Sequence, residues 1–286
     1  MNSAYPTKKV DFPAYAAHIK GLPKELHIRG QLPRNIAEKS LGIVGSRRIS
    51  PYGVRVLREF FYYIKDTESV IISGFTAGTD TYAHEFAMDS GCSTVAVMPC
   101  GCDIAHPSSN KDLYAQILNA GGAVVSEFED GFYPQKWTYP KRNRIIAALS
   151  RTLLVVEASL KSGSMITACF ARSYGRKIFS VPGDIYTERS MGTNRLILEG
   201  AEIYLSACRL SDAAGLGMGE KSYHGGSTVP TNNKEERILE ILKEKAQNYD
   251  NLSAKIGEDV RGLSVILSHM VMKNLIYEKG GTYYVL

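Results

Sequence analysis

Short apolar runs rich in β-branched residues recur between about residue 40 and residue 205, and each is followed by a turn and a segment of helical period. Continuously apolar strands that alternate with helices are typical of a parallel sheet covered by helices on both faces. The pattern therefore predicts an α/β domain with an extended Rossmann-like, doubly wound and mostly parallel sheet. The predicted strands are Leu41–Gly45, Val70–Ser73, Thr94–Met98, Ala123–Ser126, Thr152–Glu157 and Lys177–Val181.

Two stretches outside this alternation set the expected domain boundaries. Leu26–Gly30 is interpreted as an additional edge strand ahead of the first parallel strand. Residues 212–233 are rich in Gly, Ser, Thr and Asn, which is typical of a flexible linker. We therefore expect a first domain over residues 1–211, a linker over 212–233 and a second domain over 234–286.

The second domain is predicted to be a small winged helix. Lys234–Gln247 carries isoleucine and leucine at helical spacing, and Asn251–Ile256 and Leu263–Lys273 suggest two more helices. Ile276–Val285 has the pattern of a hairpin around a Gly-Gly pair. Three helices followed by a hairpin are the element order of a winged helix-turn-helix.

Composition excludes some protein classes. Of the 286 residues, 44% are hydrophobic and 22% are charged, with a net charge of +5. Such values are ordinary for a globular protein, and the small positive charge permits an anionic partner without requiring one. No run of about 18 uncharged apolar residues occurs, and no apolar run follows the first lysines, so we expect neither a membrane partner nor a signal peptide. Five cysteines without framework spacing are interpreted as reduced thiols of a cytoplasmic protein.

A cationic cluster precedes one apolar run. Residues 140–144 read Pro-Lys-Arg-Asn-Arg and are predicted to begin a helix. A helix N-terminus already carries unpaired N–H groups and a partial positive charge, so cations there oppose the dipole unless a polyanion binds. The alternative is a solvated cationic turn. The candidate residues here are Lys141, Arg142, Asn143 and Arg144.

The loops after the strands hold further candidates, because ligands bind at the carboxyl ends of parallel strands. The first loop offers a glycine turn, a hydroxyl and two guanidinium groups, and Ser50-Pro51 then starts a helix, a set that suits a phosphate. It is neither the dinucleotide fingerprint nor a Walker motif, and a plain glycine turn is the alternative. Its candidate residues are Gly45, Ser46, Arg47 and Arg48.

Later loops add polar helix starts, for which ordinary capping is the alternative interpretation. Asp80 and His84 lie four apart and lack a third metal ligand, so a capped helix with a hydrogen-bonded histidine is favoured over a metal site. The added candidates are Asn110, Lys111, Lys161, Ser162, Gly163, Ser164 and Asn194.

Together these residues predict a groove for a phosphate backbone along one edge of the sheet. Aromatic residues near the cationic cluster, Phe132, Tyr133, Trp137 and Tyr139, could stack on bases or serve in packing. No serine lies in a nucleophile elbow, no cysteine has an evident histidine partner, and the carboxylates form no clear acid–base pair. We therefore expect a binding protein, not an enzyme, with no metal and no cofactor.

Several of these motifs occur in the order found in a known family, and the chain resembles the DNA-processing protein A (DprA, also called Smf) family over about residues 5–210. The motifs are Gly45-Ser46-Arg47, Ser73-Gly74-x-x-x-Gly78-x-Asp80, Arg142–Ala147, Lys161–Ser164 and Val181-Pro182-Gly183. Many family members begin with a helical domain of sterile-alpha-motif type; we expect none here, because the first predicted strand comes too early.

The resemblance implies a protein that binds and protects single-stranded DNA and helps load the RecA-type recombinase in natural transformation. It further implies contacts through Ser46, Arg47 and the basic edge, and a homodimer formed by the Rossmann-like domain. The alternative is a nucleotide-binding Rossmann protein that acts as a sensor or a nucleoside-phosphate hydrolase. Pro182-Gly183-Asp184 stops short of the P-G-G-x-G-T signature of such hydrolases.

Overall fold

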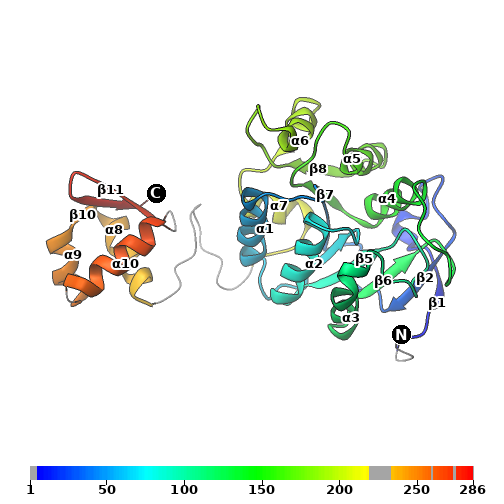
Figure 1. The fold of residues 1–286 in the computed structure, drawn as a ribbon, viewed down its shortest axis with the longest axis horizontal. Helices are drawn as coiled ribbons and strands as arrows, with labels where there is room; N and C mark the ends of the chain where they lie inside the picture. Colours follow the sequence, from blue (N-terminus) through cyan, green and yellow to red (C-terminus); the bar gives the residue numbers. More distant parts are fainter. Residues whose placement is uncertain (1–4, 219–232, 259, 273–274, 286) are drawn as a thin grey trace. The chain divides into compact units, whose positions relative to one another are not determined.

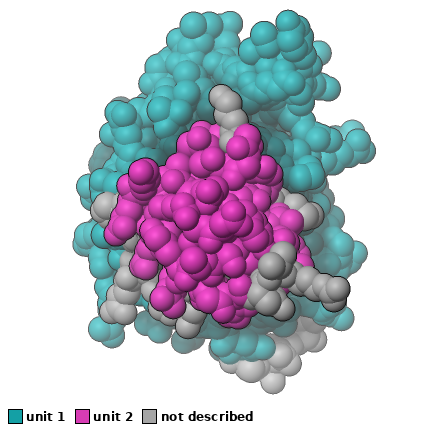
Figure 2. Space-filling model, turned by 90° about the vertical axis from the view of Figure 1, so that its left-hand side faces the viewer, with its two compact units in different colours: residues 1–223 teal, residues 224–286 magenta. Residues whose placement is uncertain are grey.

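The computed structural model in Figure 1 describes residues 5–218, 233–258, 260–272 and 275–285. Its internal contacts divide the chain into two units, Met1–Tyr223 and His224–Leu286, which Figure 2 colours separately. The first unit has the Rossmann-like α/β fold that the sequence predicts. The second unit is a small bundle of helices with its own sheet.

The first unit is built on a nine-stranded sheet of order β1-β2-β6-β5-β4-β3-β7-β8-β9. β1 and β2 pair antiparallel with each other, β2 pairs antiparallel with β6, and the remaining neighbours are parallel. All the predicted parallel strands are confirmed, with small shifts at their ends. The strands are β1 (Lys8–Asp11), β2 (Glu25–Gly30), β3 (Ser40–Val44), β4 (Val70–Ser73), β5 (Ser93–Val97), β6 (Ala123–Ser126), β7 (Thr152–Val155), β8 (Lys177–Ser180) and β9 (Glu202–Ile203).

The strand predicted at Leu26–Gly30 is present as β2, but it is not the edge of the sheet. β1 pairs along its outer side, with Lys8 opposite Ile28. The sequence of β1, Lys-Lys-Val-Asp, is mostly exposed and has no apolar run, so the pattern gave no sign of it. Charged residues on an outer strand are the usual protection against pairing with another chain.

Helices cover both faces of the sheet because its strands are apolar on both sides. Ile43 of β3 packs toward α1 and α2, and the next residue, Val44, packs toward α4 and α5. The helices are α1 (Pro51–Tyr63), α2 (Thr79–Asp89), α3 (Lys111–Asn119), α4 (Thr138–Leu149), α5 (Gly163–Ser173), α6 (Glu188–Leu198) and α7 (Ala207–Ala214), with 3₁₀ turns η1 (Ala14–Ala16) and η2 (Ser108–Asn110).

The core of the first unit extends past residue 211, where a linker was expected to begin. α7 continues to Ala214, and both Ala214 and Leu216 are buried against α1 and the sheet. Apolar residues within a Gly-rich stretch thus belong to the globular fold. Residues 219–232 of the expected linker lie outside the described residues.

The second unit contains the three helices and the hairpin that the sequence predicts, in that order. Leu242, Leu252 and Leu263 meet in its core with Ile276 of the hairpin. A short strand, β10, adds to the hairpin and makes a three-stranded antiparallel sheet of order β10-β12-β11. The elements are α8 (Asn233–Glu244), β10 (Gln247–Asn248), α9 (Tyr249–Ile256), α10 (Val260–Met272), β11 (Ile276–Lys279) and β12 (Thr282–Val285).

The cysteines and the helix lengths can be compared with two expectations from the sequence. All five cysteines are free thiols, and Cys92, Cys100 and Cys102 are buried, as expected for thiols that fill a core. Within the described ranges, no helix combines the length and apolar character needed to cross a bilayer.

Candidate nucleic-acid interface

The strand order reverses beside β3, since β4 continues the chain on one side of it and β7 pairs with it on the other. In open α/β sheets this switch point, at the carboxyl ends of the strands, is where ligands bind. The loops that follow β3, β4 and β7 meet there. They carry the predicted candidates at residues 45–48 and 161–164.

Hydrogen bonds and close backbone packing lock these loops together. The Ser164 hydroxyl donates to the carbonyl of Gly45 at 2.8 Å, and the backbone N–H of Thr79 donates to the carbonyl of Ser46 at 3.0 Å. A Cβ at Gly45 would overlap the Thr79 side chain. Gly78 has φ +83° and lies against the backbone of Ser46, where a side chain has no room. The glycines of the motif therefore serve a tight junction of loops.

A carboxylate of the protein itself lies at the N-terminus of α1. Ser50 caps this helix by accepting from the N–H of Gly53 at 3.2 Å, as the Ser-Pro start predicts. Glu157, two residues after the end of β7, accepts from the Ser50 N–H at 2.9 Å and from the Ser50 hydroxyl. In dinucleotide-binding Rossmann proteins a phosphate lies at the start of this helix. Here the buried Glu157 side chain takes that position.

Exposed cations surround the junction. Arg47, Arg48 and Lys161 are all exposed, and among the described residues none of the three forms an ion pair with an acid. The Arg47 guanidinium lies 5.4 Å from the centre of the Tyr139 ring. The Tyr139 hydroxyl lies 2.9 Å from Nε2 of His106, which follows β5. This row of side chains therefore runs from β3 toward the β5–α3 connection.

The cluster Arg142–Arg144 lies inside the protein, which differs from the expected outward-facing cationic helix start. α4 begins at Thr138, two residues before the predicted start, and its buried residues include Arg142, Asn143 and Arg144. Arg142, only 4% exposed, donates to the carbonyl of Val97 at 2.7 Å. Asn143 donates to the carbonyl of Gly163 at 3.1 Å, and Arg144 pairs with Glu127 at 2.5 Å. These groups hold α4 to its neighbours.

Lys141 is the member of the cluster that reaches solvent. Its ammonium lies 3.2 Å from the Glu127 carboxylate and within 6 Å of the ring centres of Phe128 and Trp137. Phe132 stacks on Phe128 at 4.5 Å. Of the predicted stacking candidates, Tyr133 and Trp137 are exposed, whereas Phe132 and Tyr139 are half-buried.

The side chains of two predicted contact residues bond to other parts of the protein. The Asn110 side chain is buried and donates to the Thr81 hydroxyl at 3.1 Å. The Asn194 side chain exchanges two hydrogen bonds with the backbone of Gly183, at 3.1 and 3.0 Å, and so fixes the turn after β8. Lys111 is exposed at the first residue of α3. The structure thus gathers 45–48 and 161–164 but leaves Asn110 and Asn194 as parts of the scaffold.

A buried polar network lies beneath the junction. His84 is held between the Thr94 hydroxyl at 2.7 Å and the carbonyl of Gly74 at 2.6 Å, as the favoured interpretation of a hydrogen-bonded histidine predicts. A Cβ at Gly74 would overlap both Arg142 and Asp80, so these two charged groups flank the glycine. Burial lowers the pKa of Arg142, and the nearby Asp80 carboxylate opposes that shift. No group of three potential metal ligands occurs in the described part of the chain.

The family model for DNA recombination-mediator protein A matches residues 4–214, which include the whole parallel sheet and its loops. The chain belongs to this family. Protein Smf of Synechocystis is 36% identical over 208 residues, a match covering 72% of this chain and 52% of that protein. The chain thus spans about half the length of that relative.

Two solved DprA structures share the fold. That of Streptococcus pneumoniae has a TM-score of 0.67 and 33% identity, with 75% of each chain covered. That of Helicobacter pylori, described for its single-stranded DNA binding mode, has a TM-score of 0.64 and 29% identity. It covers 73% of this chain and 94% of the other. Both matches support the assignment of the DprA fold.

Sequence reasoning missed two features of this candidate site. Glu157 was counted only among the carboxylates near strand ends that define no acid–base pair, although a carboxylate beside Ser50 is suited to a helix start. Thr79 was expected to touch no proposed contact residue, but it donates to the carbonyl of Ser46 through its hydroxyl and its N–H and closes the junction. Glu157 bonds to Ser50 and Thr79 bonds to Ser46, and these partners are distant along the chain. The order of the strands in the sheet brings them together.

Proposed function

We propose that this chain binds single-stranded DNA along the carboxyl edge of its sheet, with Arg47, Arg48 and Lys161 as the principal contacts. The proposal depends on one observation: these cations are exposed, unpaired by acids within the described residues, and set on interlocked loops. Cations held by a rigid scaffold attract phosphates without first breaking internal pairs. The Helicobacter pylori relative is described for its single-stranded DNA binding, which supports single-stranded DNA as the ligand.

We further propose that the chain protects the strand and helps load a RecA-type recombinase in natural transformation, as a binding protein without catalytic activity. Free thiols in the described structure are in keeping with a reducing cytoplasm. A homodimer is supported by apolar side chains exposed near the short edge strand β9. Leu198 is 81% exposed, and Leu205 is 72% exposed. Exposed apolar surface of this kind is favoured at subunit interfaces.

Glu157 argues against the nucleotide sensor or hydrolase as an alternative. A nucleotide phosphate at the N-terminus of α1 would meet a buried carboxylate already bonded to Ser50. Two anions at one helix start repel each other, so the usual Rossmann mode of nucleotide binding is disfavoured. A polyanion that lies across the outside of the loops avoids this conflict.

A fluorescence anisotropy titration with a poly-dT oligonucleotide, repeated from 50 to 200 mM salt, tests the proposal. Binding through several phosphates is expected to weaken by orders of magnitude over that range, since counterion release increases with each contact. Calorimetry with a panel of mononucleotides and dinucleotides provides the comparison. Tight nucleotide binding without affinity for the oligonucleotide would favour the sensor or hydrolase instead.

A further inference from the structure

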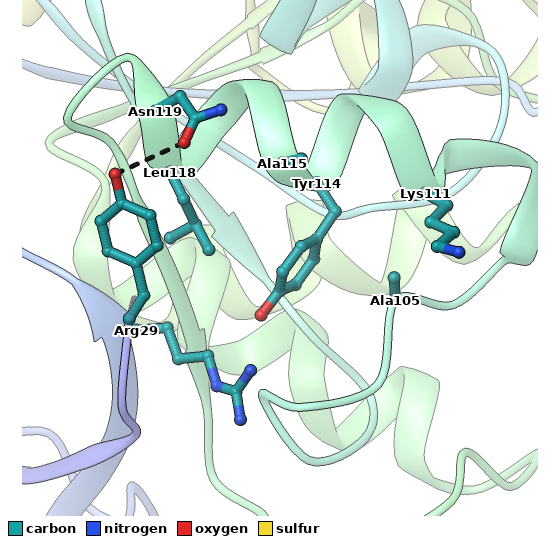
Figure 3. A pocket seen from close by; sticks show the side chains of 8 residues that line it. Arg29, Ala105, Lys111, Tyr114, Ala115, Leu118 and Asn119 are labelled. Carbon is teal, nitrogen blue, oxygen red and sulfur yellow. Dashed lines mark hydrogen bonds between the residues drawn. The ribbon is translucent and has the colours of Figure 1, made fainter. Parts of the chain in front are cut away.

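A pocket of about 330 Å³ lies along one face of α3 (Figure 3). Lys111, Ala115 and Leu118 line it from that helix, at the spacing that places side chains on one face. Arg29 of β2 lines the opposite wall. The pocket runs lengthwise along the helix, with Lys111 and Asn119 at its two ends (Figure 3).

The Lys111 end of the pocket adjoins the β5–α3 connection, toward which the proposed interface runs. Lys111 is exposed, and no ion pair to it occurs within the described residues. Ala105, beside it in the pocket wall, is followed by His106, the partner of Tyr139. Tyr139 in turn lies under the Arg47 guanidinium. The contacts of Arg47 with Tyr139 and of Tyr139 with His106 therefore lead from the proposed interface toward the Lys111 end of the pocket.

The interior of the pocket is aromatic and apolar, with polar groups at its edges. The Tyr114 hydroxyl donates to the carbonyl of Cys102, and burial raises the pKa of Tyr114 to about 12, so its ring is a neutral wall. Arg29 donates from Nε to the Thr7 hydroxyl at 2.8 Å and pairs through Nη2 with Asp130 at 3.2 Å. Its charge is balanced by Asp130, and Lys111 is left as the free cation of the pocket.

The far end of the pocket is closed by a hydrogen bond between two side chains. The Tyr5 hydroxyl donates to Oδ1 of Asn119 at 3.4 Å, drawn as the dashed line in Figure 3. The amide of Asn119 can also donate and accept hydrogen bonds at the edge of a flat ring. A volume of about 330 Å³ is at the lower end for small-molecule sites. It suits a single ring system with its sugar.

We propose that this pocket takes one unstacked nucleotide of the bound single strand, with its base against Tyr114 and Leu118 and its phosphate at Lys111. The proposal rests on the proposed function, since the strand arrives from the Arg47 edge. A base has two apolar faces and a polar rim, which match the walls and the Arg29 and Asn119 edges. A lone cation at the mouth suits one phosphate.

Filling the pocket tests the proposal. Ala115→Trp places an indole in the pocket from an exposed position of α3, so the fold tolerates it. Gln116→Trp is the matched control, because Gln116 is exposed on the same helix but does not line the pocket. We expect Ala115→Trp to weaken poly-dT binding about tenfold, as for the loss of one stacked base, and Gln116→Trp to leave it unchanged. Photo-crosslinking with an oligonucleotide containing 5-iododeoxyuridine should label Tyr5 or Tyr114 in the unmodified protein.

The outcomes separate this proposal from the proposed function. Equal affinity of the two tryptophan variants, with no crosslink to Tyr5 or Tyr114, overturns the pocket assignment while oligonucleotide binding stands. Failure of the unmodified protein to bind poly-dT overturns both. Thymidine monophosphate binding that Ala115→Trp abolishes, without any crosslink from the oligonucleotide, overturns the strand as the source of the nucleotide.

Discussion

The cations at the end of β3 and those at the start of α4 have similar sequences but opposite environments. Arg47 and Arg48 project from a loop into solvent, and no acid pairs with them within the described residues. Arg142 and Arg144 are buried and bonded to Val97, Gly21 and Glu127. The comparison teaches that the density of positive charge along a chain does not reveal which cations remain free to bind a ligand. That depends on which carboxylates and backbone carbonyls the fold places beside each cation.

Removing Arg142 is the largest perturbation that this comparison predicts. Arg142→Met keeps much of the volume but leaves the buried carbonyl of Val97 without its donor and removes the positive charge near Asp80. Leaving buried polar groups without a charged partner is expected to lower the free energy of unfolding by about 3 kcal/mol, measured by urea denaturation. Arg48→Ala is the control and should change that free energy by less than about 0.5 kcal/mol. Arg142→Met with normal stability but no DNA binding would contradict the scaffold role.

Removing Arg47 should affect binding and leave stability unchanged. Arg47→Ala loses a charge-assisted contact and is expected to weaken poly-dT binding by about 1–3 kcal/mol, with a salt slope smaller by about one unit. Anisotropy titrations at several salt concentrations measure both quantities. Arg151→Ala is the matched control, because Arg151 is an exposed arginine directly before β7, at the opposite edge of the sheet. Equal losses in the two variants would show that only overall charge matters.

The buried network beneath the junction should make stability depend on pH. Burial lowers the pKa of His84 from its ordinary value of 6.5. Near pH 6.5 the unfolded chain therefore binds a proton on His84 that the folded chain does not. The stabilisation of the fold by neutral His84 is complete above that pH and is lost as the pH falls. The free energy of unfolding is expected to decrease by up to about 1.4 kcal/mol per pH unit below pH 6.5. Urea denaturation between pH 5 and pH 7.5 measures this, and His84→Gln should flatten the slope.

Lys141 is intermediate between the exposed, unpaired arginines and the buried, paired ones. Its replacement is expected to change DNA binding least. Its ammonium is exposed but already paired with Glu127, so Lys141→Ala should weaken poly-dT binding less than about threefold. Glu127→Gln frees the lysine and is expected to strengthen binding slightly, while it destabilises the fold by removing the partner of Arg144. A tenfold loss in Lys141→Ala would instead place this residue with Arg47.

The alternation of apolar strands and helices made the parallel sheet predictable, because burial on both faces leaves a continuous apolar signal. β1 was not predicted, because it pairs along the outer side of β2 and its residues are charged and mostly exposed. The loop at residues 45–48 was recognisable from local chemistry. The inward turn of Arg142 and the role of Glu157 were not, because each depends on a partner brought near by sheet order, far away in sequence.

Glu157 gives the junction an internal carboxylate. The first turn of α1 has a bonded partner within the protein itself, so the proposed mode of DNA binding requires no rearrangement of this helix start. In the proposed binding mode, a strand contacts surface cations spaced along the edge of the sheet, outside this helix start. Recognition of that kind gains strength with each added nucleotide, which favours long strands over short fragments.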